Sequence, residues 1–135
     1  MNRTLKLTVV AGAVALLGTL PLSQAQGQGS GFTVDATLAK LGKSVWSNKG
    51  CVTCHSIGQG VRAGPDLLGV TDRRDHGWLK KWLQDPATML QSDSIAQAML
   101  AEAKGVKMPN VKLTEREIDG LIHYMAQESA KKKGG

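Results

Sequence analysis

Both cysteines of this 135-residue chain lie in one five-residue segment, Cys51-Val52-Thr53-Cys54-His55. In an exported protein two cysteines suggest a disulfide, and a Cys-x-x-Cys pair is also typical of thiol redox proteins. The histidine that follows directly is the mark of c-type haem attachment. Two thiols two residues apart can add to the two vinyl groups on one edge of a porphyrin, which places His55 beneath the ring. The sequence therefore predicts one covalently bound haem c with His55 as an iron ligand.

Two alternatives exist for this segment. A tetrahedral zinc site is disfavoured because it needs a fourth ligand and the chain has no further cysteine. A dithiol redox centre remains the main alternative. The composition favours a prosthetic group, because aromatic residues make up 4% of the chain and are a thin supply for a core.

The amino terminus has the pattern of a secretory signal. Arg3 and Lys6 precede an apolar run that ends in Leu22-Ser23-Gln24-Ala25, so we expect a signal peptide over residues 1–25 with cleavage after Ala25. An uncleaved anchor is the alternative, but the run is shorter than the ~20 residues that usually span a bilayer. We expect a periplasmic protein with no stable membrane span after cleavage.

The remaining chain is long enough for one domain with one core. We expect a flexible segment over 26–34, a folded domain over 35–129 and a disordered basic tail over 130–135. The net charge of +6 resides mostly in the signal and the tail, and charges within the domain nearly cancel. The sequence therefore shows no basic stripe for nucleic acid.

Hydrophobic periodicity predicts helices at both ends of the domain. The first helix carries an apolar stripe with Gly42 inside it, and a buried mid-helix glycine suggests that another backbone comes close. The last helix opens with the capping box Thr114-x-x-Glu117. These stripes are Leu38, Leu41, Gly42 and Val45, then Ile118, Leu121, Ile122 and Met125. We expect the two helices to cross at Gly42, near Tyr124.

An electron-carrying haem needs a sixth iron ligand, and a methionine thioether is a common one. Met108 is the best candidate, because Gly105 stops the preceding helix and Pro109 holds the segment at Met108 extended. The remaining methionines fit other roles. Met89 is expected in a short turn, Met99 on a helix face with Ile95 and Ala98, and Met125 in the stripe of the last helix.

Other polar and aromatic residues are weaker candidates for the site. His76 is expected at the surface or as a cap, and His123 is expected to be solvated, which disfavours ligation of iron by two histidines. Trp78 and Trp82 share a helix face that would pack against the porphyrin, where an indole N–H could reach a propionate. The propionate candidates among the arginines, each of which can also be simply solvated, are Arg62, Arg73 and Arg74.

Five motifs in order resemble the class I cytochrome c family. They are Gly42 with Trp46, the Cys51–His55 segment, Gly64-Pro65-Asp66-Leu67-Leu68-Gly69, the segment Trp78–Pro86, and Lys107-Met108-Pro109-Asn110 with Tyr124 after it. The resemblance implies that the Pro65 carbonyl accepts a hydrogen bond from the proximal imidazole of His55. Gly-Pro is also a common turn by itself, but a ligating imidazole generally donates its other N–H to a fixed acceptor.

The resemblance implies an all-α, cytochrome c-like bundle of about four to five helices around one covalent haem. Cys51, Cys54, His55, Pro65 and Met108 would bind the cofactor, with His55 and Met108 on iron. Such a protein is a monomeric one-electron carrier rather than an enzyme, and its partners are an upstream donor and a reductase or oxidase. Two alternatives stay open: a haem-bearing subunit of a larger redox complex, and a haem enzyme or gas sensor with an open distal position.

Overall fold

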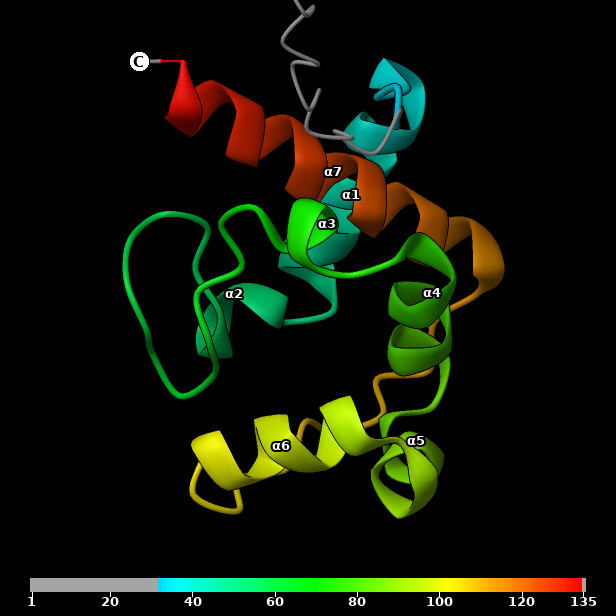
Figure 1. Cartoon of the computed structure of the whole chain (residues 1–135). Coiled ribbons are helices and arrows are strands. Elements are labelled where there is room, and N and C mark those ends of the chain that lie inside the picture. The colour runs from blue at the N-terminus through cyan, green and yellow to red at the C-terminus, as the bar shows by residue number, and fades with distance from the viewer. Residues whose placement is uncertain (1–31, 135) are drawn as a thin grey trace, which may run out of the picture.

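The computed structural model describes residues 32–134, which contain seven helices and no β-strand (Figure 1). The helices are α1 (Ala36–Asn48), α2 (Cys51–Cys54), α3 (Val70–Arg73), α4 (His76–Gln84), α5 (Pro86–Ser92), α6 (Ser94–Glu102) and α7 (Glu115–Lys133). This confirms the predicted all-α class. Because α2 and α3 have four residues each, the five longer helices correspond to the predicted four or five.

The expected signal peptide and its cleavage site lie outside the described residues, as does most of the expected segment 26–34. Of that segment, residues 32–34 are described. The Phe32 ring packs between the imidazoles of His76 and His123, at 3.9 and 4.5 Å between ring centroids. Within residues 32–134, no helix combines the length and the apolar character needed to cross a membrane.

Each of the five longer helices begins at a side chain that caps its first turn. An Asp or Thr oxygen accepts a hydrogen bond from a free backbone N–H, which stabilises the helix start. These caps are Asp35, Asp75, Asp85, Asp93 and Thr114. At α7 the predicted capping box is confirmed: Glu117 N–H donates to Thr114 Oγ1 at 3.3 Å, and Thr114 N–H donates to Glu117 Oε2 at 2.8 Å.

The main contact of the fold is the crossing of α1 and α7, which lie against each other in Figure 1. A Cβ built on Gly42 would lie 1.9 Å from the carbonyl oxygen of Gly120. A Cβ on Gly120 would in turn lie 3.0 Å from the Gly42 nitrogen. The predicted close approach at Gly42 is therefore confirmed, and its partner is a second glycine in the last helix. Near the crossing, the Trp46 and Tyr124 rings lie 5.9 Å apart.

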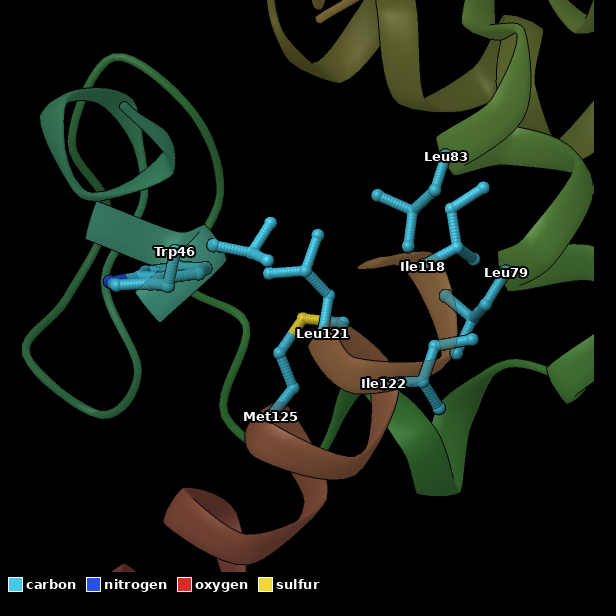
Figure 2. Close-up of a cluster of buried hydrophobic side chains, with 8 residues drawn as sticks. Trp46, Leu79, Leu83, Ile118, Leu121, Ile122 and Met125 are labelled. Carbon is cyan, nitrogen blue, oxygen red and sulfur yellow. The ribbon is translucent and has the colours of Figure 1, made fainter. Parts of the chain in front are cut away.

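The hydrophobic core forms where α4 and α1 meet the inner face of α7 (Figure 2). Figure 2 shows Leu79 and Leu83 of α4 facing Ile118 and Ile122 of α7. The core residues are Val45, Trp46, Leu79, Leu83, Ile118, Leu121, Ile122 and Met125. The predicted stripe of the last helix is thereby confirmed, since all four of its members are buried.

The structure corrects the expected disordered tail. Helix α7 continues through Lys133, so residues 130–133 are helical rather than disordered. The Lys133 ammonium lies 2.6 Å from the Asp72 carboxylate of α3, which ties the end of α7 to the body of the domain. The three lysines of the last turn also suit the negative end of the helix dipole.

The segment 86–102 differs from expectation at two points. Met89 lies in α5 rather than in a turn, because Asp85 caps that helix and Pro86 occupies its first position, where proline is favoured. The expected inner face of α6 is also wrong: Ile95 and Ala98 are exposed, while Ala96 is buried.

Candidate haem site

The two cysteines lie in the single turn α2, which follows the end of α1 closely. Gly50, with φ of 74°, makes the left-handed turn between the two helices. Cys51 is half-buried, Cys54 is exposed, and neither is in a disulfide. Burial raises the pKa of the Cys51 thiol, although a backbone hydrogen bond opposes the rise. Redox-active dithiols depend on a lowered pKa, so this environment disfavours the dithiol alternative.

The His55 ring is held from two directions. Its Nδ1 lies 2.9 Å from the carbonyl oxygen of Pro65. Since a carbonyl can only accept, Nδ1 carries the proton, and Nε2 is the nitrogen with a free lone pair. On another side the ring packs against Gly64, where a Cβ would lie 2.5 Å from His55 Cε1. The hydrogen bond implied by the family resemblance is thus present in the structure.

Met108 lies in the irregular segment between α6 and α7. Lys104 and Gly105, with φ of 52° and 84°, end the turn after α6. The Met108 side chain is half-buried against the core.

The segment that carries Met108 is tied to the body of the domain on both sides. Asn110 Nδ2 donates to the Gln84 carbonyl at 3.3 Å, and Lys49 Nζ donates to the Lys112 carbonyl at 3.2 Å. These contacts join the segment to the ends of α4 and α1.

All five residues predicted for the site line one cavity of about 680 Å³. These residues are Cys51, Cys54, His55, Pro65 and Met108. The elements that contribute residues to this lining lie on four sides of the molecule in Figure 1. Helix α7 is above, α4 on the right, α6 below, and α2 with its following loop on the left. Ligand pockets usually have volumes of about 300–1,000 Å³, so the cavity can hold a large cofactor.

The lining of the cavity suits a flat apolar group that carries carboxylates. Apolar side chains from α1, α4, α6 and α7 form much of the wall, with the stacked indoles of Trp78 and Trp82 5.7 Å apart on one side. Cationic side chains outnumber the two carboxylates in the lining, Asp66 and Glu102. The cationic residues are Arg62, Arg73, Arg74, Lys104 and Lys107. A haem with two propionates fits this donor set.

Several side chains at the cavity already have protein partners. Arg62 donates to the Val52 carbonyl at 3.0 Å, and Arg73 donates to the Leu68 carbonyl. The Trp78 indole N–H donates to Asp93 at 3.1 Å. The suggestion that this indole reaches a propionate is therefore not supported.

Met99 of α6 lines the same cavity as Met108, together with its neighbour Leu100. Met99 is thus a second thioether near the site, although it lies within a regular helix. The distinction between Met99 and Met108 lies in their backbones, because Met99 is fixed inside α6 and Met108 belongs to an irregular segment.

His76 and His123 lie outside the cavity lining. His123, expected to be solvated, is half-buried, and its Nδ1 accepts a hydrogen bond from the Asp35 N–H at 2.9 Å. His76 is also half-buried, and its Nε2 is buried without a hydrogen-bond partner. Both histidines anchor Phe32 at the start of the described chain.

The model of the family described as cytochrome c matches residues 39–129. The chain belongs to the cytochrome c family. A cytochrome c domain binds haem c covalently and transfers electrons through its iron, and this cytochrome c has two thiols at the required spacing.

Two curated relatives of this cytochrome c are each named as a subunit of nitric oxide reductase. The protein from Stutzerimonas stutzeri is 29% identical over 94 residues, covering 62% of this chain and 53% of the relative. The protein from Cereibacter sphaeroides is 30% identical over 92 residues, covering 63% of this chain and 56% of the relative. This cytochrome c spans about half the length of the curated relatives that it matches.

A solved structure confirms the fold. The cytochrome c from Rhodothermus marinus superposes with a TM-score of 0.67 at 26% identity, covering 73% of this chain and 83% of that protein. The similarity covers most of residues 32–134.

One residue at the site is not predicted from the sequence. Asp66 belongs to the motif Gly64–Gly69 and has no expected role there, yet its carboxylate accepts four hydrogen bonds in the structure. The sequence feature that could indicate this role is an acidic residue directly after Gly-Pro, with Gly58 and Gly60 a few residues before it. Glycine N–H groups are well exposed for binding a carboxylate, because no side chain shields them.

Proposed function

We propose that this cytochrome c is a monomeric, periplasmic one-electron carrier with a single haem c. Cys51 and Cys54 would form its two thioether bonds, and His55 and Met108 would ligate its iron. The observation that carries the proposal is that all four side chains line one cavity while His55 Nδ1 is held by the Pro65 carbonyl. Bound haem supplies the one-electron chemistry, and its potential depends on its ligands and its burial.

His55 serves as the proximal ligand in this proposal. Its Nδ1–H donates to the Pro65 carbonyl, which selects the tautomer with a free lone pair on Nε2. Gly64 packs against the ring and restricts its rotation. The imidazole therefore holds one orientation whatever the oxidation state of the iron.

Met108 serves as the distal ligand. Pro109 follows it directly, and the contacts of Asn110 and Lys112 fix the segment that carries it. A thioether held in this way remains in place on oxidation and reduction, so the surroundings reorganise little during electron transfer. Thioether ligation also raises the reduction potential relative to a second nitrogen ligand.

The cationic side chains that line the cavity balance the charge of two haem propionates. Arg74 lies 5.8 Å from the centre of the Trp78 ring and faces the cavity. Lys104 and Lys107 line the cavity beside Met108 and are exposed. These exposed lysines can also steer an acidic redox partner toward the site, an effect that rises at low salt.

The intact mass of the exported protein tests the attachment, the haem count and the cleavage site together. We expect a chain that begins at Gln26 and carries the mass of one haem, which acidified acetone does not extract. As a matched control, a Cys51→Ala, Cys54→Ala double variant should lose its haem to the same treatment. Haem that acetone removes from the wild-type protein contradicts the proposal, and a retained signal segment contradicts the periplasmic part of it.

A second function is favoured by the curated relatives: the chain would be the electron-entry subunit of a larger reductase. Both relatives are named as subunits of nitric oxide reductase, and both are about twice as long as the matched region. Affinity isolation from periplasmic and membrane fractions, followed by size-exclusion chromatography, separates the two functions. A carrier elutes alone at its monomer mass, whereas a subunit elutes with its catalytic partner.

A further inference from the structure

Asp66 lies directly after Pro65, at the end of the loop that returns the chain to His55. The loop leaves His55, passes through three glycines and comes back to place the Pro65 carbonyl on His55 Nδ1. The Asp66 carboxylate lies on the inner side of this loop and accepts hydrogen bonds along its length. It therefore connects several parts of the loop to one another.

Each oxygen of Asp66 accepts two hydrogen bonds. Oδ1 accepts from the N–H groups of Gly58 and Leu68, both at 2.8 Å. Oδ2 accepts from the Gly60 N–H at 2.6 Å and from the Ser56 hydroxyl at 3.0 Å. The hydroxyl shares its one proton with the Gly60 carbonyl, which lies 2.5 Å from it. Three of the four donors are backbone groups, so the carboxylate fixes the path of the chain rather than the pose of a side chain.

The network acts on the residues next to the His55 hydrogen bond. Ser56 follows His55 and Asp66 follows Pro65, and these two neighbours are paired in a parallel backbone bridge. The Leu67 N–H donates to the Ser56 carbonyl at 2.8 Å. These contacts therefore help to set the distance between the His55 and Pro65 segments.

The charge on Asp66 is well stabilised. Partial burial works to raise its pKa, but hydrogen bonds from Gly58, Leu68, Gly60 and Ser56 outweigh that effect and hold the pKa well below its ordinary value. Hydrogen bonds to a charged acceptor are stronger than those between neutral groups. The carboxylate thus remains an acceptor for all four donors throughout the neutral range.

We propose that Asp66 is a positioning residue, which holds the Pro65 carbonyl on His55 Nδ1 and thereby sets the orientation and basicity of the proximal imidazole. The inference rests on the proposed role of His55 as the iron ligand. A firm acceptor for Nδ1–H places more electron density on the ring and favours ferric iron. Loss of the Asp66 network frees the carbonyl to move, weakens this bond and raises the reduction potential.

The test compares Asp66→Asn, Asp66→Ala and the control Asp72→Asn in the haem-loaded protein. The control removes one carboxylate from the neighbouring helix α3, where Asp72 pairs with Lys133 rather than with the donors of the Asp66 network. Nuclear magnetic resonance of the ferrous protein measures hydrogen exchange at His55 Nδ1–H and at the amides of Gly58, Gly60 and Leu68. Voltammetry measures the potential of each variant.

In Asp66→Ala we expect all four N–H groups to exchange faster by about tenfold or more, with a higher potential. Asp66→Asn keeps one acceptor oxygen, so it should protect Gly58 and Leu68, release Gly60 and shift the potential less. The Asn variant keeps the shape of the side chain, which preserves a folded protein for measurement if the Ala variant unfolds. Asp72→Asn should leave exchange at His55 Nδ1–H unchanged.

Two results overturn the inference. In the first, the loop amides of Asp66→Asn or Asp66→Ala exchange faster while His55 Nδ1–H and the potential stay at their wild-type values. That result makes Asp66 an ordinary stabiliser of the loop. In the second, Asp72→Asn shifts the potential as much as Asp66→Asn, which assigns the effect to charge alone. Failure of the proposed function is distinct, since it appears in the wild-type protein as absent His55 ligation.

Discussion

The imidazole of His55 rests on the bare Cα of Gly64, so that a Cβ added at Gly64 would lie 2.5 Å from His55 Cε1 and 2.8 Å from Nδ1. Neither side of this contact can move freely. The His55 ring is bonded to the Pro65 carbonyl, and the Gly64 N–H donates to the Cys54 carbonyl at 2.7 Å. The position of the ring therefore depends on the absence of a methyl group.

Gly64→Ala should displace the imidazole from its acceptor. Overpacking of a well-packed site costs about 1–3 kcal/mol, so we expect a loss of about 2 kcal/mol in the free energy of unfolding and a shifted His55 ring resonance. Denaturant titration and NMR of the ferrous protein measure these effects. In the control Gly77→Ala, the added Cβ meets a movable carboxylate, Asp75 Oδ1 at 3.0 Å, and His55 should be unaffected. A Gly64→Ala protein with wild-type stability and His55 resonances would contradict the prediction.

Gly42→Ala should separate α1 from α7. Alanine favours a helix over glycine by about 1 kcal/mol, but its Cβ would meet the Gly120 carbonyl at 1.9 Å, and a backbone atom cannot rotate away. We expect a net destabilisation of about 3 kcal/mol, at the upper end for overpacking, measured by denaturant titration. Lys43→Ala, at the exposed neighbouring position of α1, should change stability little. Equal stabilities for the two variants would refute the role of this crossing.

Met108→Ala should open the distal side of the iron. The ferric protein should lose the weak long-wavelength charge-transfer band of sulfur-ligated haem, and the ferrous protein should bind carbon monoxide readily. Met99→Ala is the matched control, since Met99 lines the same cavity from α6, and it should keep the band. Met125 is 4% exposed, so Met125→Ala should keep the band but lose about 2–5 kcal/mol of stability. Wild-type protein that binds carbon monoxide readily would instead favour a sensor or an enzyme.

Stability should fall as the pH drops below about 6.5, the ordinary pKa of histidine, because of His76. Burial lowers the pKa of His76, Asp75 raises it in part, and His123 and Lys80 lower it further. Between the folded and unfolded pKa values the unfolded chain binds more protons, so acid favours unfolding there. His76→Gln should lessen this dependence, which denaturant midpoints from pH 7.5 to 5 would show. Equal slopes for the variant and the wild-type protein would rule out a contribution from His76.

Local patterns predict the elements of the fold well. Thr114 and Glu117 are close in sequence, and the capping box they form depends on nothing else in the molecule. The stripe of α7 is a property of one helix, and it is buried as expected. The start of α5 could also be predicted from the sequence, because Asp85 followed by Pro86 has the pattern of a helix cap and a first helical position. The expectation of a turn at Met89 overlooks this pattern and is wrong.

Contacts between distant residues cannot be read in the same way. The sequence indicates that Gly42 needs a close neighbour, but not that Gly120 is that neighbour. His123 is bonded to the Asp35 N–H, which lies 88 positions away in the sequence, and no local pattern reports such a bond. The same limit applies to Trp78, whose indole N–H is expected at the cofactor and donates to Asp93 instead.

For the site, spacing predicts the cysteines and His55, while backbone restriction selects Met108. The structure brings these residues and Pro65 to one cavity, and their binding to haem stays a prediction until it is measured. Asp66 escapes prediction because its role depends on a loop that folds back on itself. The backbone donors of the Asp66 carboxylate can be identified only when the path of the chain through Gly58 and Gly60 is known.

The crossing of α1 and α7 also bears on the order in which the domain can assemble. Gly42 and Gly120 belong to the first and last helices, so their contact closes a loop of nearly the whole domain, at an entropic cost of about 4 kcal/mol for a flexible chain. A chain whose carboxyl-terminal part is not yet synthesised lacks α7 and cannot form this contact. The segment Cys51–His55 lies inside that loop, so both thiols remain in an open chain until the carboxyl-terminal helix arrives.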